Sequence, residues 1–232
     1  MRLLLTSAGV TNGSIREALV GLLGKPIAES KAVCVPTAIY AMPEGGAYAW
    51  QELREVGGLG WRDFGLLELT ALPSIAEGHW LPSVEAADAI VVGGGITPYL
   101  SYWMQESGFA GKLPGLLANK VYVGASAGSI VAGPRLHVDR DELERTGVYN
   151  DDEYGDPAPP GAGSDRGLGL VSFAVRPHLN SRDFPNADMA TMEGWAAKLD
   201  VPTYAIDDGT AIKVVDGEVE VVSEGEWRLF GG

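Results

Sequence analysis

Several residue types that define common protein classes are scarce in this sequence. Cys34 is the only cysteine among 232 residues, which excludes an intrachain disulfide and a metal site built from several cysteines. Basic residues number 17 against 31 acidic ones, and the formal net charge is −14. A chain this acidic repels phosphate backbones and anionic lipids. We therefore expect neither nucleic acid nor a membrane surface as a partner.

Long apolar runs are missing as well. The apolar N-terminal stretch covers only a few residues, whereas a secretory signal is longer and a membrane helix longer still. We therefore expect a cytoplasmic protein. The hydrophobic share of 46% and the charged share of 21% are ordinary for a soluble globular protein. The length predicts a single domain over residues 1–232.

The pattern of apolar residues predicts an α/β fold. Short apolar runs alternate with amphipathic stretches, as in proteins built around a largely parallel sheet. The predicted strands cover residues 3–6, 32–36, 66–69, 89–92, 121–123 and 169–175, and the predicted helices cover residues 14–23, 97–107 and 187–199. The tail differs, because Asp-Gly turn signals separate the short runs 204–206, 211–215 and 219–222. It predicts antiparallel strands at one edge of the sheet.

The sharpest motif is Gly124-Ala125-Ser126-Ala127-Gly128, directly after the predicted strand 121–123. A strand-to-helix turn flanked by glycines lets the backbone take a strained conformation that projects a serine oxygen. The amide of Ala127 and the start of the next helix would favour negative charge that develops in the site. We interpret Ser126 as a nucleophile. The alternative is a small-residue turn where a helix packs tightly on the sheet.

Gly93-Gly94-Gly95 follows another predicted strand. Three consecutive glycines allow backbone amides to approach a ligand closely. The triplet lacks the later glycines and the lysine of nucleotide-binding motifs. It suits the second half of an oxyanion hole better, because a nucleophilic serine turn needs a donor from the loop of a neighbouring strand. A tight turn without function is the alternative.

A serine nucleophile needs a base, and the sequence offers three histidines. His79 lies in a predicted loop, and His137 lies soon after the helix that follows the serine. His178 follows a predicted strand within Pro177-His178-Leu179-Asn180. That position is the carboxyl end of a strand, where the active sites of α/β proteins form. We therefore interpret His178 as the base.

The acid that orients the imidazole is less defined. The chain order serine, acid, histidine leaves Asp139, Asp141 and Glu142 as candidates. Only one of the three can fill the role, so the others would be surface carboxylates or something similar. If none of the three orients the imidazole, the orienting group lies elsewhere, for example at Asp207 or Asp208. The motifs imply no metal and no organic cofactor.

These motifs in combination resemble the peptidase E (aspartyl dipeptidase) and cyanophycinase family of serine peptidases. The resemblance is carried by Val-Gly-Gly-Gly at 92–95, Gly-x-Ser-Ala-Gly at 124–128 and Pro-His-x-Asn at 177–180, and it extends over almost the whole chain. It implies a fold similar to class I glutamine amidotransferases, with serine where those enzymes carry cysteine. The expected architecture is a three-layer α/β sandwich with a mostly parallel central sheet and a short antiparallel C-terminal extension.

The resemblance also implies roles for individual residues. Ser126 would be the nucleophile and His178 the base, and an ungapped comparison from the serine places the acid on Asp141. The other implied site residues are the oxyanion donors Gly95 and Ala127 and the substrate-binding residues Gly94, Ile96, Asn180 and Arg182. The implied activity is hydrolysis of dipeptides or short peptides through an acyl-enzyme.

Two departures from the family pattern bear on specificity. Peptidase E has asparagine directly after its glycine triplet, where this chain has Ile96. Members that select aspartate carry arginine after the histidine, and here that segment offers only Arg182, beside Asp183. We therefore expect broader specificity than a strict preference for aspartate. An amidase of non-peptide amides, a catalytically silent binding protein on the same fold and a homodimer all stay open.

Overall fold

The computed structural model describes residues 1–136 and 166–231. Its central sheet has seven strands in the order β3-β2-β4-β5-β1-β8-β9. The strands are β1 (Arg2–Thr6), β2 (Lys31–Val35), β3 (Asp63–Leu66), β4 (Ala89–Val92), β5 (Val121–Ala125), β8 (Thr210–Val215) and β9 (Glu218–Ser223). The first five pair in parallel, and β8 and β9 pair antiparallel. The predicted α/β class with a mostly parallel sheet is confirmed.

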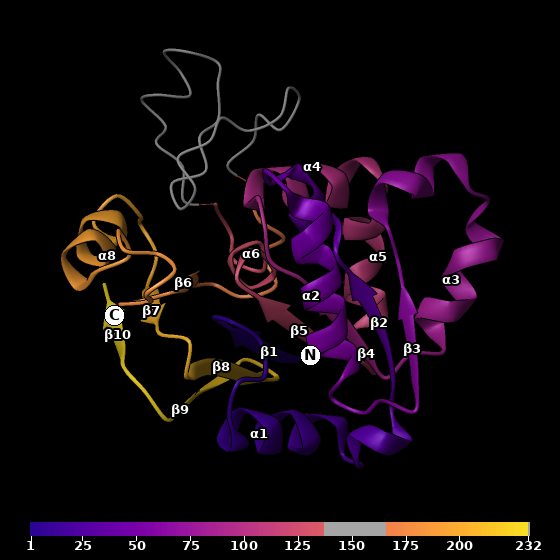
Figure 1. Ribbon diagram of the computed structural model, residues 1–232, viewed down its shortest axis with the longest axis horizontal. Helices are drawn as coiled ribbons and strands as arrows, with labels where there is room; N and C mark the ends of the chain where they lie inside the picture. The colour runs from indigo at the N-terminus through magenta and orange to yellow at the C-terminus, as the bar shows by residue number, and fades with distance from the viewer. Residues whose placement is uncertain (137–165, 232) are drawn as a thin grey trace.

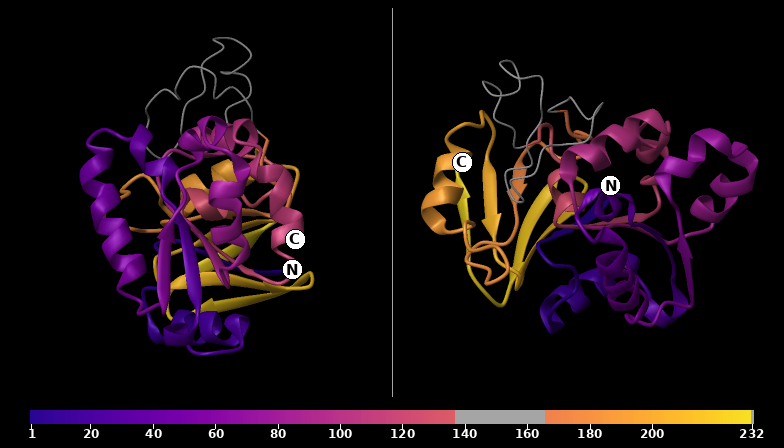
Figure 2. Two further views of the ribbon diagram at one scale, coloured as in Figure 1. Left: turned by 90° about the vertical axis from the view of Figure 1, so that its right-hand side faces the viewer. Right: turned by 45° about the horizontal axis from the view of Figure 1, so that its top comes forward.

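Helices cover both faces of this sheet (Figures 1 and 2). They are α1 (Gly13–Leu23), α2 (Gly45–Gly57), α3 (Glu77–Glu85), α4 (Thr97–Glu106), α5 (Phe109–Leu116) and α6 (Ala127–Ile130). Side chains alternate along β1, as a period of two requires. Leu4 packs in one apolar cluster with α1, whereas Leu3 and Leu5 pack in another with α3, α4 and α5. The sheet therefore forms the middle layer of three.

A second, smaller sheet lies beside the first in the order β10-β7-β6. It consists of β6 (Ala174–Arg176), β7 (Thr203–Ile206) and β10 (Trp227–Phe230), and α8 (Met189–Ala196) packs near it. The prediction that residues 204–206 extend the central sheet was therefore wrong. β7 pairs in parallel with β6 instead, because Ala205 is buried in an apolar cluster with Met192 of α8. Only β8 and β9 form the predicted antiparallel edge.

Several element boundaries differ from the sequence prediction. The predicted strand 66–69 overlaps β3 only at Leu66. Leu69 begins the 3₁₀ helix η3 (Leu69–Ser74), because the Glu68 carboxylate accepts the backbone N–H of Thr70 and caps that turn. The strand predicted over 169–175 is the short β6. The cap of α1 is Asn12 rather than Ser14, since the Asn12 side chain accepts the N–H of Ile15 at 2.9 Å. No helix in the described part of the chain is long and apolar enough to cross a membrane.

The sheet register brings three loops together at one edge. Thr6 pairs with Ala125, and Val92 pairs with Gly124. The residues that follow β1, β4 and β5 therefore leave the sheet side by side, as carboxyl ends of parallel strands do. These are Ser7, the glycine triplet 93–95 and Ser126.

Candidate active site

Ser126 occupies the sharp turn between β5 and α6. Its φ is 47° and its ψ is −113°, a conformation that costs free energy for any residue with a side chain. Its backbone N–H donates to the carbonyl of Ser7 at 2.8 Å, which anchors the turn to the end of β1. The side chain is 6% exposed. The turn therefore fixes the hydroxyl at the carboxyl edge of the sheet.

The glycines on both sides of the turn are required by space. A Cβ atom at Gly124 would lie 2.6 Å from the carbonyl oxygen of Gly128. A Cβ atom at Gly128 would overlap the carbonyl of Val92 in the neighbouring strand. Helix α6 can therefore pack directly on β4 and β5, and its first turn lies against the serine.

His178 reaches the serine from the smaller sheet. It follows β6, and its Nε2 lies 3.0 Å from the Ser126 Oγ. The ring is buried, and Phe184 stacks on it at 4.0 Å between ring centroids and 14° between planes. His178 has a φ of 64°, so the backbone is strained here as it is at Ser126. Packing and strain together fix the direction of the imidazole.

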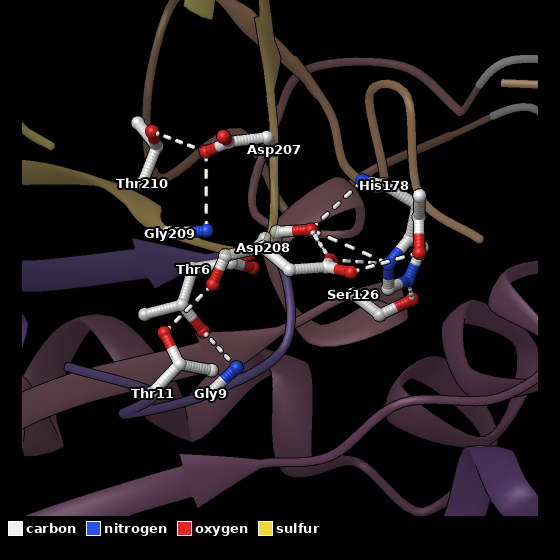
Figure 3. A network of polar contacts seen from close by, with 12 residues as sticks. Thr6, Gly9, Thr11, Ser126, His178, Asp207, Asp208, Gly209 and Thr210 are labelled. Atoms are coloured by element: carbon white, nitrogen blue, oxygen red, sulfur yellow. Dashed lines mark hydrogen bonds and ion pairs between the residues drawn. The ribbon is translucent and has the colours of Figure 1, made fainter. Parts of the chain in front are cut away.

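Asp208 lies on the other side of the imidazole. Its Oδ1 is 2.8 Å from the His178 Nδ1 (Figure 3). Burial by itself would raise the pKa of the carboxyl. Hydrogen bonds from His178, Ser7 and Ser181, together with the charge of His178, outweigh burial and lower the pKa to about 2. Asp208 is therefore ionised at neutral pH and can stabilise an imidazolium.

Ser7 connects Asp208 to His178. Its Oγ donates to the Asp208 Oδ1 at 2.6 Å and accepts the backbone N–H of His178 at 2.8 Å. Ser181 donates to the other carboxylate oxygen of Asp208 at 2.8 Å. The carboxylate is therefore fixed from both sides and cannot rotate away from the imidazole without the loss of a charge-assisted hydrogen bond.

The turn that carries Asp208 is itself stabilised by Asp207. The Asp207 side chain accepts the N–H of Gly209 at 3.1 Å and the hydroxyl of Thr210 at 2.7 Å (Figure 3). It also accepts the N–H of Glu226 at 2.6 Å. Two adjacent aspartates thus have different roles: one closes the turn and the other faces the histidine.

Comparison with known proteins places this arrangement in a family. The sequence model of Peptidase family S51 matches residues 3–222. The chain belongs to peptidase family S51. Because the match covers nearly the whole chain, it includes all three residues of the Ser126, His178 and Asp208 arrangement.

Individual relatives of this S51 member agree with the family assignment. A peptidase E from Nostoc sp. (strain PCC 7120 / SAG 25.82 / UTEX 2576) is 29% identical over 173 residues, which cover 70% of this chain and 63% of the relative. The match thus spans less than two thirds of that relative's length.

Two solved structures share the fold of this S51 member. A candidate peptidase E from Listeria monocytogenes EGD-e has a TM-score of 0.65 at 20% identity, with 97% of this chain and 98% of that chain covered. A peptidase from an acI-B1 actinobacterium has a TM-score of 0.62 at 19% identity, with 99% of this chain and 93% of that chain covered.

For the acid beside His178, the sequence prediction and the structure of this S51 member differ. Asp139, Asp141 and Glu142 lie outside the described residues. Asp208 occupies the hydrogen-bonding position at Nδ1 of His178, whereas the sequence pattern made it, with Asp207, only an alternative to those three acids. The missed signal is position: Asp208 follows a strand that runs parallel to β6, so it lies at the same edge as His178.

The glycine triplet lies against Ser126. A Cβ atom at Gly94 would be 3.4 Å from the Ser126 Cβ and 3.9 Å from its Oγ. Gly95 has a φ of 125°, and a side chain there would overlap the backbone of Ala38. The described residues make no hydrogen bond to the N–H of Gly95 or of Ala127. Both N–H groups are therefore suited to bind an oxyanion.

The other predicted substrate-binding residues differ in placement. Ile96 is 3% exposed, and its N–H donates to the carbonyl of Ala38. Asn180 is exposed, and its side-chain amide donates to Glu226 at 2.9 Å. Arg182 and its neighbour Asp183 are both exposed. Substrate contact by Ile96, Asn180 and Arg182 stays a prediction.

The position of Ser7 leads to a first test. Ser7→Ala removes the donor to Asp208 and leaves the buried N–H of His178 without its acceptor. An unsatisfied buried group costs about 1–3 kcal/mol, so we expect kcat/KM to fall by about 10- to 100-fold through misalignment of His178. Steady-state kinetics on folded protein would measure this.

Ser101→Ala is the matched control for that test. Ser101 is also buried, at 3% exposure, and it donates to the carbonyl of Arg166 at 2.7 Å, away from the histidine. We expect this variant to lose stability but to keep its turnover. Equal turnover of Ser7→Ala and Ser101→Ala would show that Ser7 has no part in alignment.

Proposed function

We propose that this protein is a serine peptidase that hydrolyses dipeptides or short peptides through an acyl-enzyme. One observation carries the proposal: the His178 ring lies 3.0 Å from the Ser126 Oγ at Nε2 and 2.8 Å from the Asp208 carboxylate at Nδ1. A nucleophile, a base and an orienting acid in this order are the working parts of serine acyl transfer. Membership of peptidase family S51 supports the same reaction.

The first half of the reaction forms the acyl-enzyme. As the Ser126 Oγ attacks the peptide carbonyl, its proton passes to Nε2 of His178, and a tetrahedral oxyanion forms. The carbon–nitrogen bond then breaks, and the imidazolium returns the proton to the leaving amine. Water repeats the sequence in the second half, with His178 again as base, and releases the acid product and the free serine.

Asp208 supplies the third role in this proposal, in place of Asp141. A neutral imidazole carries one proton, and the carboxylate at Nδ1 fixes that proton on the nitrogen away from the serine. Ionised Asp208 also stabilises the imidazolium that forms after proton transfer. The pKa of about 2 supports this role, because the carboxyl remains ionised throughout the pH range in which a histidine titrates.

The backbone N–H groups of Gly95 and Ala127 form the proposed oxyanion hole. They come from loops on either side of Ser126, one after β4 and one at the start of α6. Donors fixed before the reaction stabilise the developing charge without reorganisation. The N-terminal end of α6 adds a partial positive charge to the same place.

The proposed peptidase has only a weak preference for aspartate. A peptidase selective for aspartate needs a buried cation or several donors to replace the water lost by the substrate carboxylate. Here Ile96 is apolar, and Arg182 is exposed beside Asp183. The other arginine near the histidine, Arg176, is buried and lies over the ring of Trp195 at 3.6 Å from its centroid. We therefore expect kcat/KM for Asp-Xaa dipeptides to exceed that for Ala-Xaa and Leu-Xaa by less than about a thousandfold, roughly 4 kcal/mol.

A dipeptide panel with a simple amide as comparison checks both activity and specificity. Wild type should hydrolyse several dipeptides, and a fluorophosphonate should label it covalently at Ser126. Turnover of the simple amide without any dipeptide would indicate an amidase. An aspartate preference above the stated limit would show that the substrate carboxylate meets a cation or a set of donors stronger than Arg182 beside Asp183.

A further inference from the structure

Glu52 is an acidic residue whose carboxyl lies directly behind the glycine triplet. It belongs to α2, and its Oε1 accepts the backbone N–H of Gly94 at 2.8 Å. The carboxyl fills the space that a side chain at Gly93 would need, since a Cβ atom there would overlap it. The absence of a side chain at Gly93 therefore gives Glu52 its access to the turn.

This carboxyl is poorly compensated. Its Oε2 is buried and has no hydrogen-bond partner among the described residues. Burial raises the pKa of Glu52 to about 7, and Glu55 adds to the rise, although the Gly94 N–H opposes it. A buried carboxyl without a cation is more stable in its neutral form.

The ionisable groups that interact with Glu52 come from three elements. They are Cys34 on β2, Tyr40 in the 3₁₀ helix η2 (Thr37–Ala41) and Glu55 one turn along α2. Burial raises the pKa of both Cys34 and Tyr40, and the charge of Glu52 raises each further. All three groups are neutral or negative, so none of them favours an ionised Glu52.

The turn that Glu52 contacts lies beside the reacting atoms. Gly94 packs against Ser126, and the next residue, Gly95, supplies a proposed oxyanion donor. The far side of the turn is fixed by Ala38, whose carbonyl accepts the N–H of Ile96 at 3.0 Å. The turn thus has two anchors, Glu52 on one side and Ala38 on the other, and the donor of Gly95 lies between them.

We propose that Glu52 is a positioning residue that, in its protonated form, sets the direction of the oxyanion donor at Gly95, and that its ionisation slows attack by Ser126. The inference rests on the proposed function. The physical reason is charge: the transition state places negative charge on the oxyanion, and a carboxylate behind the same turn repels it in a poorly solvated setting. A neutral carboxyl keeps the Gly94 hydrogen bond without that repulsion.

The test follows the rate of covalent labelling by a neutral fluorophosphonate from about pH 5 to 9. This probe has no ionisable group, and its attack by Ser126 uses the oxyanion hole. For wild type we expect a rise at acidic pH, where an imidazole loses its proton, and then a fall of about tenfold above pH 7. In Glu52→Gln, which keeps the oxygen acceptor and cannot ionise, the fall should be absent.

Two further variants separate positioning from structure. Glu55→Gln removes the same charge from an exposed site one turn away, and it should keep the wild-type profile. Glu52→Ala removes the acceptor of the Gly94 N–H together with the ionisable group. Below about pH 7 it should label about tenfold more slowly than wild type through the loss of alignment, and it should show no alkaline fall. If Glu52→Ala does not fold, the profile of Glu52→Gln still decides the matter.

Thermal unfolding reports the protonation of Glu52 without any activity. The folded pKa lies above the unfolded one, so the folded state binds more protons between about pH 4.5 and 7, and wild-type stability falls across that window. As the pH rises from about 4.5 to 7, the Tm of Glu52→Gln minus the Tm of wild type should therefore increase by several degrees.

Four outcomes would overturn the inference: an alkaline fall retained in Glu52→Gln, a fall lost in Glu55→Gln, an unchanged Tm difference, or labelling of folded Glu52→Ala at the wild-type rate below pH 7. Equal labelling of Ser126→Ala would instead overturn the proposed function.

Discussion

Ser126→Ala is expected to abolish peptide hydrolysis while the fold persists. Loss of the nucleophile removes the covalent step altogether, and in a well-studied serine protease the corresponding loss is roughly 10⁶ in kcat. The fold should persist because the Ser126 backbone N–H, rather than its hydroxyl, anchors the turn to the carbonyl of Ser7. The strained φ of 47° is common to serine and alanine, so the loss of the contact between the Ser126 Oγ and His178 is the only structural cost.

The measurement is the single-turnover rate on the dipeptide that wild type hydrolyses fastest. Ser129→Ala is the matched control, because Ser129 is a buried serine in the next helix whose hydroxyl donates to the carbonyl of Thr6 at 2.7 Å. It should keep most of its activity. Hydrolysis by purified Ser126→Ala at the wild-type rate would refute a covalent serine mechanism.

Asp208→Asn is expected to lower kcat by about 10⁴, as when the same change traps the wrong imidazole tautomer in a serine protease. The amide can present its NH₂ group to Nδ1 of His178, which then places the imidazole proton on Nε2. That nitrogen can no longer accept the proton of Ser126. KM should change little, because Asp208 acts on the imidazole rather than on bound substrate.

The comparison variants are Asp139→Asn, Asp141→Asn and Glu142→Gln, the acids that the sequence pattern favoured. Each should keep kcat within a few-fold of wild type, because Nδ1 of His178 carries a single proton and Asp208 lies 2.8 Å from it. A larger loss in Asp141→Asn than in Asp208→Asn would restore the acid that the sequence predicts.

The parts of the site that could be predicted from sequence are local in the chain. The turn at 124–128 needs small residues because of atoms within the turn and in the adjacent strand, so its signature is written in consecutive residues. The glycine triplet can be recognised in the sequence for the same reason. His178 could be selected because the sequence has three histidines and because His178 follows a predicted strand.

The sequence did not favour Asp208 because its place beside His178 depends on the pairing of two strands that are far apart in the chain. Asp208 lies in the turn between β7 of the smaller sheet and β8 of the central sheet. The turn signal Asp-Gly accounts for residue 209 and for the Asp207 side chain that caps the turn, and it gives no reason to assign chemistry to Asp208. The parallel pairing of β6 and β7 within the smaller sheet brings that carboxylate to His178.

Glu52 is a second residue whose surroundings the sequence could not predict. In the sequence it is one of two acidic residues within 45–57, a segment to which the sequence pattern assigned no element, and nothing separates it from Glu55. In the structure Glu52 reaches Gly94 beneath the triplet, whereas Glu55 stays exposed. Sequence periodicity assigns a face of a helix, but the depth of a side chain depends on what its neighbours leave open, which at Gly93 is the space of a missing side chain.

The sequence by itself therefore determined the α/β class, the serine turn, the glycine triplet and the histidine, because each rests on neighbouring residues or on a strand's end. The tertiary structure alone decided which carboxylate faces the imidazole and which carboxyl lies behind the oxyanion loop. The physical reason is that electrostatic and hydrogen-bonding roles depend on distances through space between segments up to 201 residues apart, as Ser7 and Asp208 are. Such distances have no counterpart in the order of residues along the chain.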